Sequence, residues 1–338
     1  MKNIPAVLTL IILLFTVSLL DFHLALAQTK PTATKYDIRS AQKLYAQKEY
    51  EKVIAELSAR VEKLSRDGLL LLARSYSSIK NPIEAIKTGS IILSTNPDDF
   101  EVKTFLGQEQ IHLGKDREAL ITLRESLELN KKYEPTYLSI AEIYERRKNK
   151  YELRLLYLDM IESLGEKPAY ITKVCQLATL EGLYDLSTQY CRKGIQVDPN
   201  DYRNPLYLGL TFKETGKIEE ATKLLKKTAD LFPKSEEAQI TWAQHLDGQK
   251  NYVASLGYYQ RAVQASPNSI NGLLGLAQSS FELKKYDEAL QFWKKACQLN
   301  GKATNSSLRK ATNVVRLSRQ AELLTKFEAA VDTCIKME

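Results

Sequence analysis

The chain has 338 residues, and its 48 basic and 41 acidic side chains give a formal net charge of +7 at neutral pH. This mild excess falls well short of the clustered basic face that nucleic-acid binding requires, so a nucleic-acid partner is not expected. The sequence also lacks a phosphate-binding glycine loop and a G-x-S-x-G nucleophile motif. We therefore predict a protein that is not an enzyme and needs no cofactor.

The first segment differs from the rest of the chain. Lys2 precedes an apolar run over residues 6–20, and Ala25 and Ala27 then form a small-x-small pattern. The run is shorter than the roughly 20 residues that a membrane-spanning helix needs, and the pattern is typical of a signal peptide cleaved after Ala27. We predict a signal peptide at residues 1–27, a flexible lead at 28–33, and a mature chain in the periplasm, with secretion as the alternative. An uncleaved membrane anchor is the other interpretation of this segment.

From residue 34 onward the sequence repeats with a period of 34 residues, after one shorter copy. When each unit is numbered from 1, position 8 always holds a small residue: Ala41, Ala73, Gly107, Ala141, Cys175, Gly209, Ala243 and Ala277. Small side chains are needed where two antiparallel helices approach closely. Each unit is therefore predicted to be a helical pair, with the first helix over positions 2–14 and the second from position 18. Position 15, in the turn between them, is glycine or lysine.

The end of each unit carries a second regular feature. Position 32 holds Pro97, Pro199, Pro233 and Pro267, whereas Ser65, Lys131, Gly165 and Gly301 replace proline in other units, where we expect turns of a different shape.

This pattern resembles the tetratricopeptide repeat, a helix-turn-helix unit of 34 residues with small residues at positions 8 and 20 and a proline near position 32. The resemblance implies an all-α fold, an α-solenoid coiled into a right-handed superhelix of about eight repeats. Their predicted bounds are 34–65, 66–99, 100–133, 134–167, 168–201, 202–235, 236–269 and 270–303. Residues 304–338 lose the small-residue signature but keep a helical apolar stripe through Leu308, Val315 and Phe327. They are predicted to form a C-terminal cap over the open end of the stack.

Four cysteines follow the predicted signal peptide, which places them in an oxidising compartment. Cys175 and Cys191 occupy positions 8 and 24 of one unit, so they lie at similar height on facing helices. A disulfide and a pair of buried thiols both fit this placing, because a bridge requires Cα atoms within roughly 7 Å. Cys297 and Cys334 form a second candidate pair, which would join the cap to the last full repeat.

A metal site is not expected. His112 and His245 lie in distant units, and Glu109 is the one acidic residue that shares a helix face with His112. Two ligands fall short of a site, so both histidines are predicted to be ordinary surface or packing residues.

A candidate binding face lies on the first helix of each unit, where positions 5, 9 and 12 point away from the packing face. In the family that the chain resembles, this face looks into the concave groove where partner peptides lie. The candidate groove residues at positions 5 and 9 are Gln42, Leu70, Arg74, Gln108, Leu138, Glu142, Gln176, Leu206, Gln244, Leu274 and Gln278. A row of amides can donate to and accept from the backbone of an extended ligand. The alternative is that glutamine is an exposed helix former here and that position 5 packs between helices.

We therefore predict a non-enzymatic scaffold or assembly adaptor of the cell envelope, which binds an extended or helical segment of another protein in the groove. The alternative function is binding of cell wall or glycan, with Tyr45 and Phe281 at position 12 stacking on sugars. Relatives that grip a carboxylate tail use lysine and asparagine in the groove. That ligand is not expected here, because positions 5 and 9 offer only Arg74 as a cation.

Overall fold

The computed structural model describes residues 35–337, and every regular element in that range is a helix. The predicted signal peptide and lead lie outside the described residues. Among residues 35–337, no helix combines the length and the apolar content that crossing a bilayer requires. The chain divides into two compact units, Met1–Ile140 and Ala141–Glu338, and the division falls within helix α8 (Glu134–Arg146).

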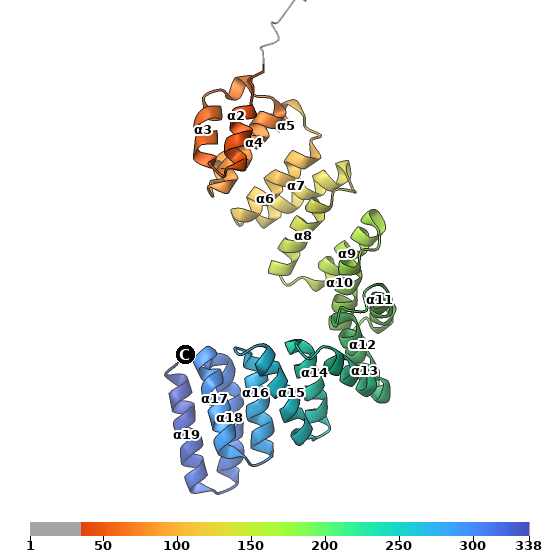
Figure 1. The fold of residues 1–338 in the computed structure, drawn as a ribbon, viewed down its shortest axis with the longest axis vertical. Coiled ribbons are helices and arrows are strands. Elements are labelled where there is room, and N and C mark those ends of the chain that lie inside the picture. The colour runs from red at the N-terminus through yellow and green to blue at the C-terminus, as the bar shows by residue number, and fades with distance from the viewer. Residues whose placement is uncertain (1–34, 338) are drawn as a thin grey trace, which may run out of the picture. The chain divides into compact units, whose positions relative to one another are not determined.

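In the first unit the helices follow one another as antiparallel pairs (Figure 1). They are α2 (Arg39–Ala46), α3 (Tyr50–Ser58), the short 3-10 turn η1 (Val61–Lys63), α4 (Arg66–Ser78), α5 (Pro82–Thr95), α6 (Phe100–His112) and α7 (Asp116–Leu129), followed by the start of α8. The first pair is shorter than the others. Its helices still bury Ala41, Val53 and Leu57 completely, so it closes this end of the apolar core.

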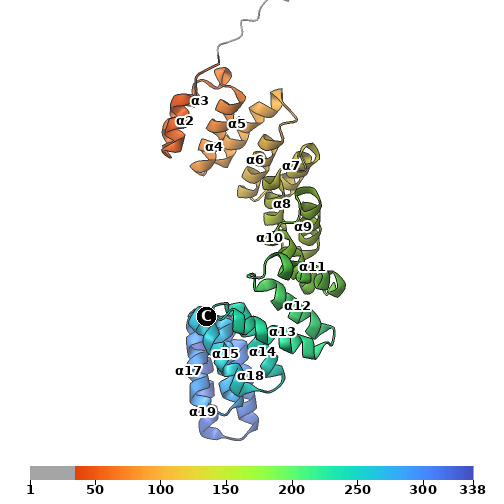
Figure 2. The same cartoon turned by 45° about the vertical axis from the view of Figure 1, so that its right-hand side comes forward.

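The second unit continues the same arrangement, and Figure 2 shows its pairs from another side. Its helices are α9 (Lys150–Leu164), α10 (Pro168–Leu180), α11 (Tyr184–Val197), α12 (Arg203–Glu214), α13 (Ile218–Leu231), α14 (Glu236–Gly248), α15 (Tyr252–Ala265), α16 (Ile270–Glu282), α17 (Tyr286–Leu299), α18 (Gly301–Leu317) and α19 (Ala321–Ile335). The predicted all-α solenoid of helical pairs is confirmed.

The helix starts keep the 34-residue period. The second helices of seven successive pairs start at Pro82, Asp116, Lys150, Tyr184, Ile218, Tyr252 and Tyr286. The second helices begin one residue earlier than predicted, at position 17. Helix α2 begins later than predicted, at position 6 of the short first unit, and α12 begins at position 2 as predicted. The other first helices from α4 to α16 begin one residue early, at position 1. The shift has a local cause: Ser65, Ser235 and Ser269, at the last position of the preceding unit, cap the helices that follow through their side-chain oxygens.

Position 8 is the point of closest approach between the two helices of a pair. A Cβ atom on Gly107 would lie 2.5 Å from Leu123 Cγ, and one on Gly209 would lie 2.6 Å from Leu225 Cδ2. Leu123 and Leu225 both stand at position 24 and are almost fully buried. The small residue at position 8 is therefore required by the residue that faces it at position 24.

The turn inside each pair needs a left-handed backbone. Gly114, Gly182 and Gly216 adopt φ values of 72° to 77° there. Lysine has the same backbone conformation in the other turns, with φ between 54° and 61° at Lys48, Lys80, Lys148, Lys250 and Lys284. A left-handed conformation costs a residue with a Cβ about 1–2 kcal/mol, so these turns carry strain that glycine would relieve.

Of the turns that lack the position-32 proline, the turn at Gly165 differs in shape as expected, whereas the turn at Lys131 does not, so the expectation is wrong there. Helix α9 runs on to Leu164 and ends at Gly165, whose φ of 90° and ψ of 171° are accessible to glycine. The corresponding residues after α7 and α15, Asn130 and Ser266, have φ of −149° and −134°.

The C-terminal cap is a further helical pair. Helix α18 starts at Gly301, before the predicted unit boundary at residue 304, because Asn300 caps it. Phe327 on α19 is completely buried, and its ring lies 5.7 Å from Phe281 and 5.9 Å from Trp293. These aromatic contacts place the cap against the last full repeat.

Candidate partner-binding surface

The glutamines at position 9 have two different environments. Gln42 and Gln244 are exposed. Gln108 Nε2, in contrast, donates to Ser139 Oγ at 3.0 Å, and Gln176 Nε2 donates to the hydroxyl of Tyr207 at 2.8 Å. In both cases the acceptor belongs to the next repeat. Gln108 and Gln176 therefore link neighbouring repeats, and a ligand would have to replace these bonds.

The other polar residues at position 9 are charged or bonded within their own helix. Arg74 donates to Glu101 at 2.8 Å, and the exposed Glu142 lies 3.9 Å from Arg146. Gln278 donates to Glu282 at 2.8 Å. All three are accessible to solvent, at least in part.

The leucines at position 5 are mostly buried. Leu70 and Leu206 expose 4% and 1% of their surface, whereas Leu138 exposes 48% and Leu274 is half-buried. Packing between helices, the alternative interpretation, describes Leu70 and Leu206, which offer a ligand almost no surface. Leu138 is the accessible apolar residue of this set.

The aromatic residues of the glycan alternative offer little. Phe281 is buried in the core of the cap, where its ring also lies 5.5 Å from Tyr286. Tyr45 is half-buried and has an edge contact with Tyr50 at 5.2 Å. A sugar ring therefore has no open aromatic face at Phe281 to stack on.

A charged junction connects α4 and α6 in the first unit. Arg66 contacts Asp99 at 2.8 Å and Glu101 at 2.6 Å, and Arg74 contacts Glu101 from about two turns further along α4. The hydrogen bond from Arg66 holds the pKa of Asp99 below its usual value. Glu101 stands at position 2 of its repeat and takes both of its cations from the preceding repeat.

A second junction, in the second unit, is also built around a glutamate at position 2, but tyrosine hydroxyls take the place of the arginines. Glu237, also at position 2, accepts from the Tyr207 hydroxyl at 2.9 Å and from the Tyr202 hydroxyl at 3.2 Å. Burial, together with the charge of Glu237, raises the pKa of both tyrosines, so both hydroxyls stay protonated as donors at neutral pH. Sequence reasoning missed this junction, because it considered positions 5, 9 and 12 but not the acidic residue at position 2.

A hollow with a volume of about 410 Å³ opens beside this junction. It is lined by Tyr202, Lys234, Ser235, Glu236, Glu237, Ile240, Thr241 and Asn271, from α12, α14, α16 and the turns before them. Its walls combine an aromatic ring, an aliphatic side chain and two carboxylates.

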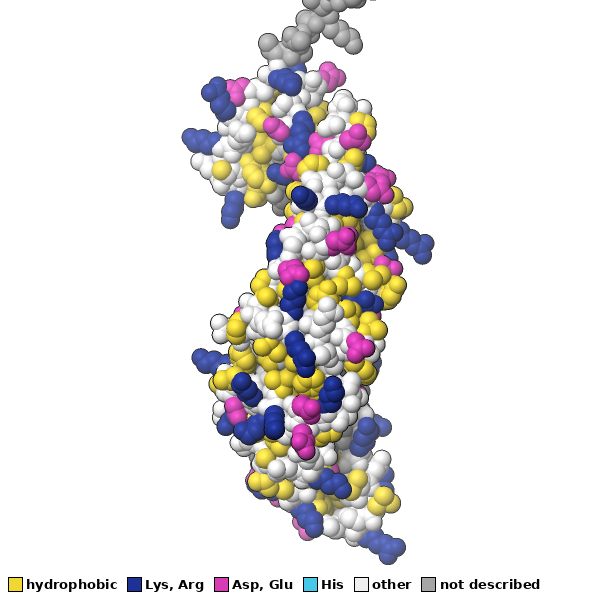
Figure 3. Space-filling model, turned by 90° about the vertical axis from the view of Figure 1, so that its right-hand side faces the viewer, with side chains coloured by type: hydrophobic (Ala, Val, Ile, Leu, Met, Phe, Trp, Pro, Cys, Tyr) yellow, Lys and Arg dark blue, Asp and Glu magenta, His cyan; other side chains and the backbone are white. Residues whose placement is uncertain are grey.

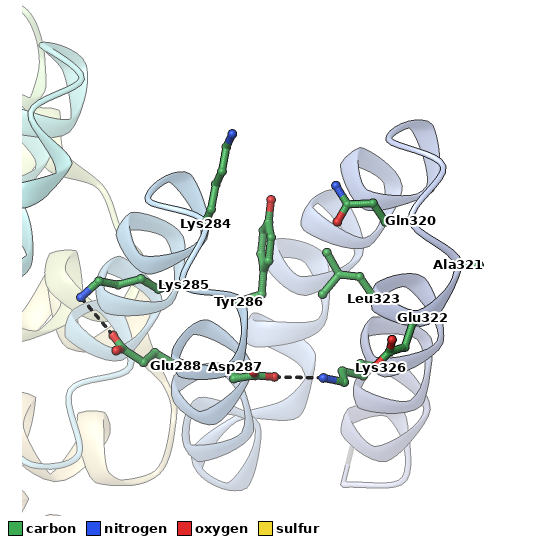
Figure 4. Close-up of a pocket in the computed structure, with 10 residues that line it drawn as sticks. All are labelled: Lys284, Lys285, Tyr286, Asp287, Glu288, Gln320, Ala321, Glu322, Leu323 and Lys326. Carbon is green, nitrogen blue, oxygen red and sulfur yellow. Dashed lines mark hydrogen bonds and ion pairs between the residues drawn. The ribbon is translucent and has the colours of Figure 1, made fainter.

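A larger hollow, of about 630 Å³, lies between the start of α17 and the start of α19 (Figure 4). In Figure 4, Lys285 pairs with Glu288 at 3.6 Å and Lys326 pairs with Asp287 at 3.4 Å. Because basic and acidic side chains both line it, it favours neither an anion nor a cation. Basic and acidic side chains are similarly mixed over the face in Figure 3.

Both candidate cysteine pairs are bonded in the structure. The Cα atoms are 4.8 Å apart in the Cys175–Cys191 disulfide and 5.4 Å apart in the Cys297–Cys334 disulfide. The first joins positions 8 and 24 of one repeat, and the second joins α17 to α19. Each bridge therefore crosses an interface that is already packed.

The two histidines of the described residues have different environments. His112 is exposed and its Nδ1 lies 3.4 Å from Glu109 Oε1, whereas His245 is buried, bonds Thr222 Oγ1 at 2.8 Å and stacks on Trp242. Within residues 35–337, no three His, Cys, Asp or Glu side chains are grouped closely enough to hold a metal ion.

Comparisons with known proteins agree with the fold. The family model described as "Anaphase-promoting complex, cyclosome, subunit 3" matches residues 214–296. A tetratricopeptide repeat protein from Parabacteroides merdae is similar in structure, with a TM-score of 0.55 and 15% identity over 78% of this chain and 98% of that one. The APC/C hetero-tetramer Cut9–Hcn1 has a TM-score of 0.50 and 13% identity, over 80% of this chain and 54% of that one. No curated protein gave a significant match to the sequence. Together with the 34-residue helical pairs, these matches show that the chain has the fold of tetratricopeptide repeat proteins.

Proposed function

We propose that the protein is a non-enzymatic scaffold that binds a segment of another protein along the position-9 face of its first helices. The observation that carries the proposal is a polar side chain at position 9 in every repeat except the one with Leu210. Of these side chains, Gln42, Arg74, Glu142 and Gln244 are exposed. Within a unit, exposed amides and charges repeated at one position of the first helices can bond an extended chain at several points. Cut9–Hcn1, a structural neighbour, is itself a multi-subunit assembly.

We further propose that the protein acts in the cell envelope, in the periplasm, as an assembly adaptor. Two features support export: the signal-like sequence of residues 1–27 and the pairing of all four cysteines. Disulfides persist in oxidising compartments and are rare in the cytosol. The mass of the protein purified from the periplasm, without reductant, is expected to correspond to a chain that begins at Gln28 and holds two disulfides. A full-length reduced chain in the cytosol would refute this assignment.

The binding face is tested by capture of partners from envelope extract with crosslinking and mass spectrometry. Replacing Gln108, Gln176 and Gln244 together by alanine is expected to weaken capture. Because Gln108 and Gln176 also bond to neighbouring repeats, Gln244→Ala alone is the cleaner variant, since this side chain is exposed. The matched control is Gln260→Ala, an exposed glutamine on a second helix. Helicity is followed by circular dichroism. Unchanged capture by the triple variant would refute binding at this face.

A further inference from the structure

The hollow beside Glu237 contains two carboxylates and no cation that pairs with them. Glu237 accepts its two hydrogen bonds from tyrosine hydroxyls, and Glu236 accepts one from Ser269 Oγ. None of the ion pairs among residues 35–337 involves either glutamate. Glu237 is exposed and Glu236 is half-buried, so a ligand in the hollow can reach both.

The chain itself shows which group fits this register. At the corresponding position of the first unit, Glu101 binds Arg66 Nη2 at 2.6 Å and Arg74 Nη2 at 2.8 Å. Arg66 and Arg74 stand at positions 1 and 9 of the preceding repeat, and the equivalent residues before Glu237 are Tyr202 and Leu210. The second junction thus has the same carboxylate as the first but neither of its two guanidinium groups.

The other walls of the hollow suit a long basic side chain. The ring of Tyr202 offers a face to a cation, which attracts it by cation–π interaction, and Ile240 offers an apolar surface to the aliphatic stem. Asn271 and Thr241 add polar groups to the rim. Lys234 is the one basic residue of the lining, and it is exposed, so it can turn away from an incoming cation.

We propose that this hollow binds an arginine side chain of the partner segment, with the guanidinium on the carboxylate of Glu237. Arginine is favoured over lysine because its planar guanidinium can make two parallel hydrogen bonds to one carboxylate. The inference rests on the proposed function, since it supplies the chemistry of the segment that the scaffold binds. It predicts that the bound segment contains at least one arginine.

The test uses N-acetyl-arginine amide as a probe and follows the side-chain amide signals of Asn271 by NMR in the mature chain. N-acetyl-citrulline amide, which has nearly the same shape without the charge, is the matched ligand control. The arginine amide is expected to shift the Asn271 signals with saturation, and the citrulline amide is expected to leave them unchanged at the same concentrations. Equal shifts with both ligands would overturn the proposal.

Two variants complete the test. Glu237→Gln keeps the shape of the side chain and removes its charge, and it is expected to weaken arginine-amide binding about tenfold, as for loss of a hydrogen bond between charged groups. Lys234→Ala removes the opposing charge and is expected to tighten binding about twofold. Because both residues are exposed, thermal melting should confirm that the fold is kept. Unchanged affinity of Glu237→Gln would overturn the proposal.

Partner capture and arginine-amide binding together distinguish failure of the scaffold function from failure of the arginine site. If no partner protein is captured but the arginine amide still binds through Glu237, the scaffold function fails and the cation site stands. If a partner is captured equally by the wild type and by Glu237→Gln, and the arginine amide does not bind, the cation site fails and the scaffold function stands.

Discussion

Replacing Gly209 by alanine tests the packing rule that defines every repeat. Gly209 is buried in α12 at position 8, and an added Cβ would lie 2.6 Å from Leu225 Cδ2 and 2.8 Å from Leu225 Cγ. Real Cβ atoms do not approach other carbons so closely, so α12 and α13 must move apart or Leu225 must change its rotamer. Since Leu225 is 1% exposed and packed on all sides, either adjustment disturbs the core.

The expected magnitude follows from two opposing contributions. Forcing an extra methyl group into a packed core costs typically about 1–3 kcal/mol, while alanine is better than glycine in a helix by about 1 kcal/mol. The net prediction is a destabilisation of about 1 kcal/mol. Gly257→Ala is the matched control: Gly257 is exposed in the middle of α15, and a Cβ there meets no atom within 4 Å. This variant should be more stable than the wild type by about 0.5–1 kcal/mol.

Urea unfolding followed by circular dichroism measures both variants. Hydrogen exchange in α12 and α13 adds a local readout, which matters because repeat proteins can open one repeat at a time. Loss of protection should centre on these two helices in Gly209→Ala. If Gly209→Ala were as stable as Gly257→Ala, close approach at position 8 would not be the reason for its small residues.

Three further predictions concern the cap, a turn and a buried histidine. Replacing Cys297 and Cys334 together by alanine should destabilise the cap by about 4 kcal/mol, from the chain entropy of a loop spanning 37 residues; hydrogen exchange of α19 measures this, and unchanged protection would contradict it. Lys250→Gly should raise the urea midpoint, because glycine removes the strain of the left-handed backbone at this position (φ 60°). The net gain in unfolding free energy is about 0.5–1 kcal/mol once the greater chain entropy of glycine in the unfolded state is subtracted. Burial lowers the pKa of His245, so the unfolded chain takes up its proton first as pH falls below about 6.5 and the folded state loses stability through that range. His245→Gln should reduce the fall of the urea midpoint between pH 7.5 and 5.5. An equally steep fall in the variant would show that His245 is not its cause.

The sequence predicted the fold in detail because the determining interactions are local and repeated. Position 8 and the period placed the helices from α4 to α17 to within one residue, and glycine or lysine at position 15 marked the left-handed turns. The sequence did not decide whether Cys175 and Cys191 form a disulfide, because this depends on an interhelical distance that the spacing of the two residues alone does not give. The 4.8 Å between these Cα atoms follows from the close packing of positions 8 and 24.

The candidate site was less predictable because it depends on neighbouring repeats. Leu206 and Leu138 share one register, yet one is buried and the other is 48% exposed, since the helices around them differ. Gln176, a predicted groove residue, also bonds Tyr207 of the next repeat, which the sequence alone did not indicate. The hollow beside Glu237 becomes visible only when it is known which residues of the preceding repeat reach that carboxylate.

The most direct measurement of partner binding is photo-crosslinking from defined positions in the protein. A photoreactive residue placed at Gln244 reports on the position-9 face, and one placed at Val253, which is 73% exposed on a second helix, reports on the second-helix surface of the same repeat. A scaffold that binds along its first helices should give a specific protein crosslink from Gln244 and none from Val253. A crosslink from Val253 alone would place the partner on the second helices and contradict the proposed binding face.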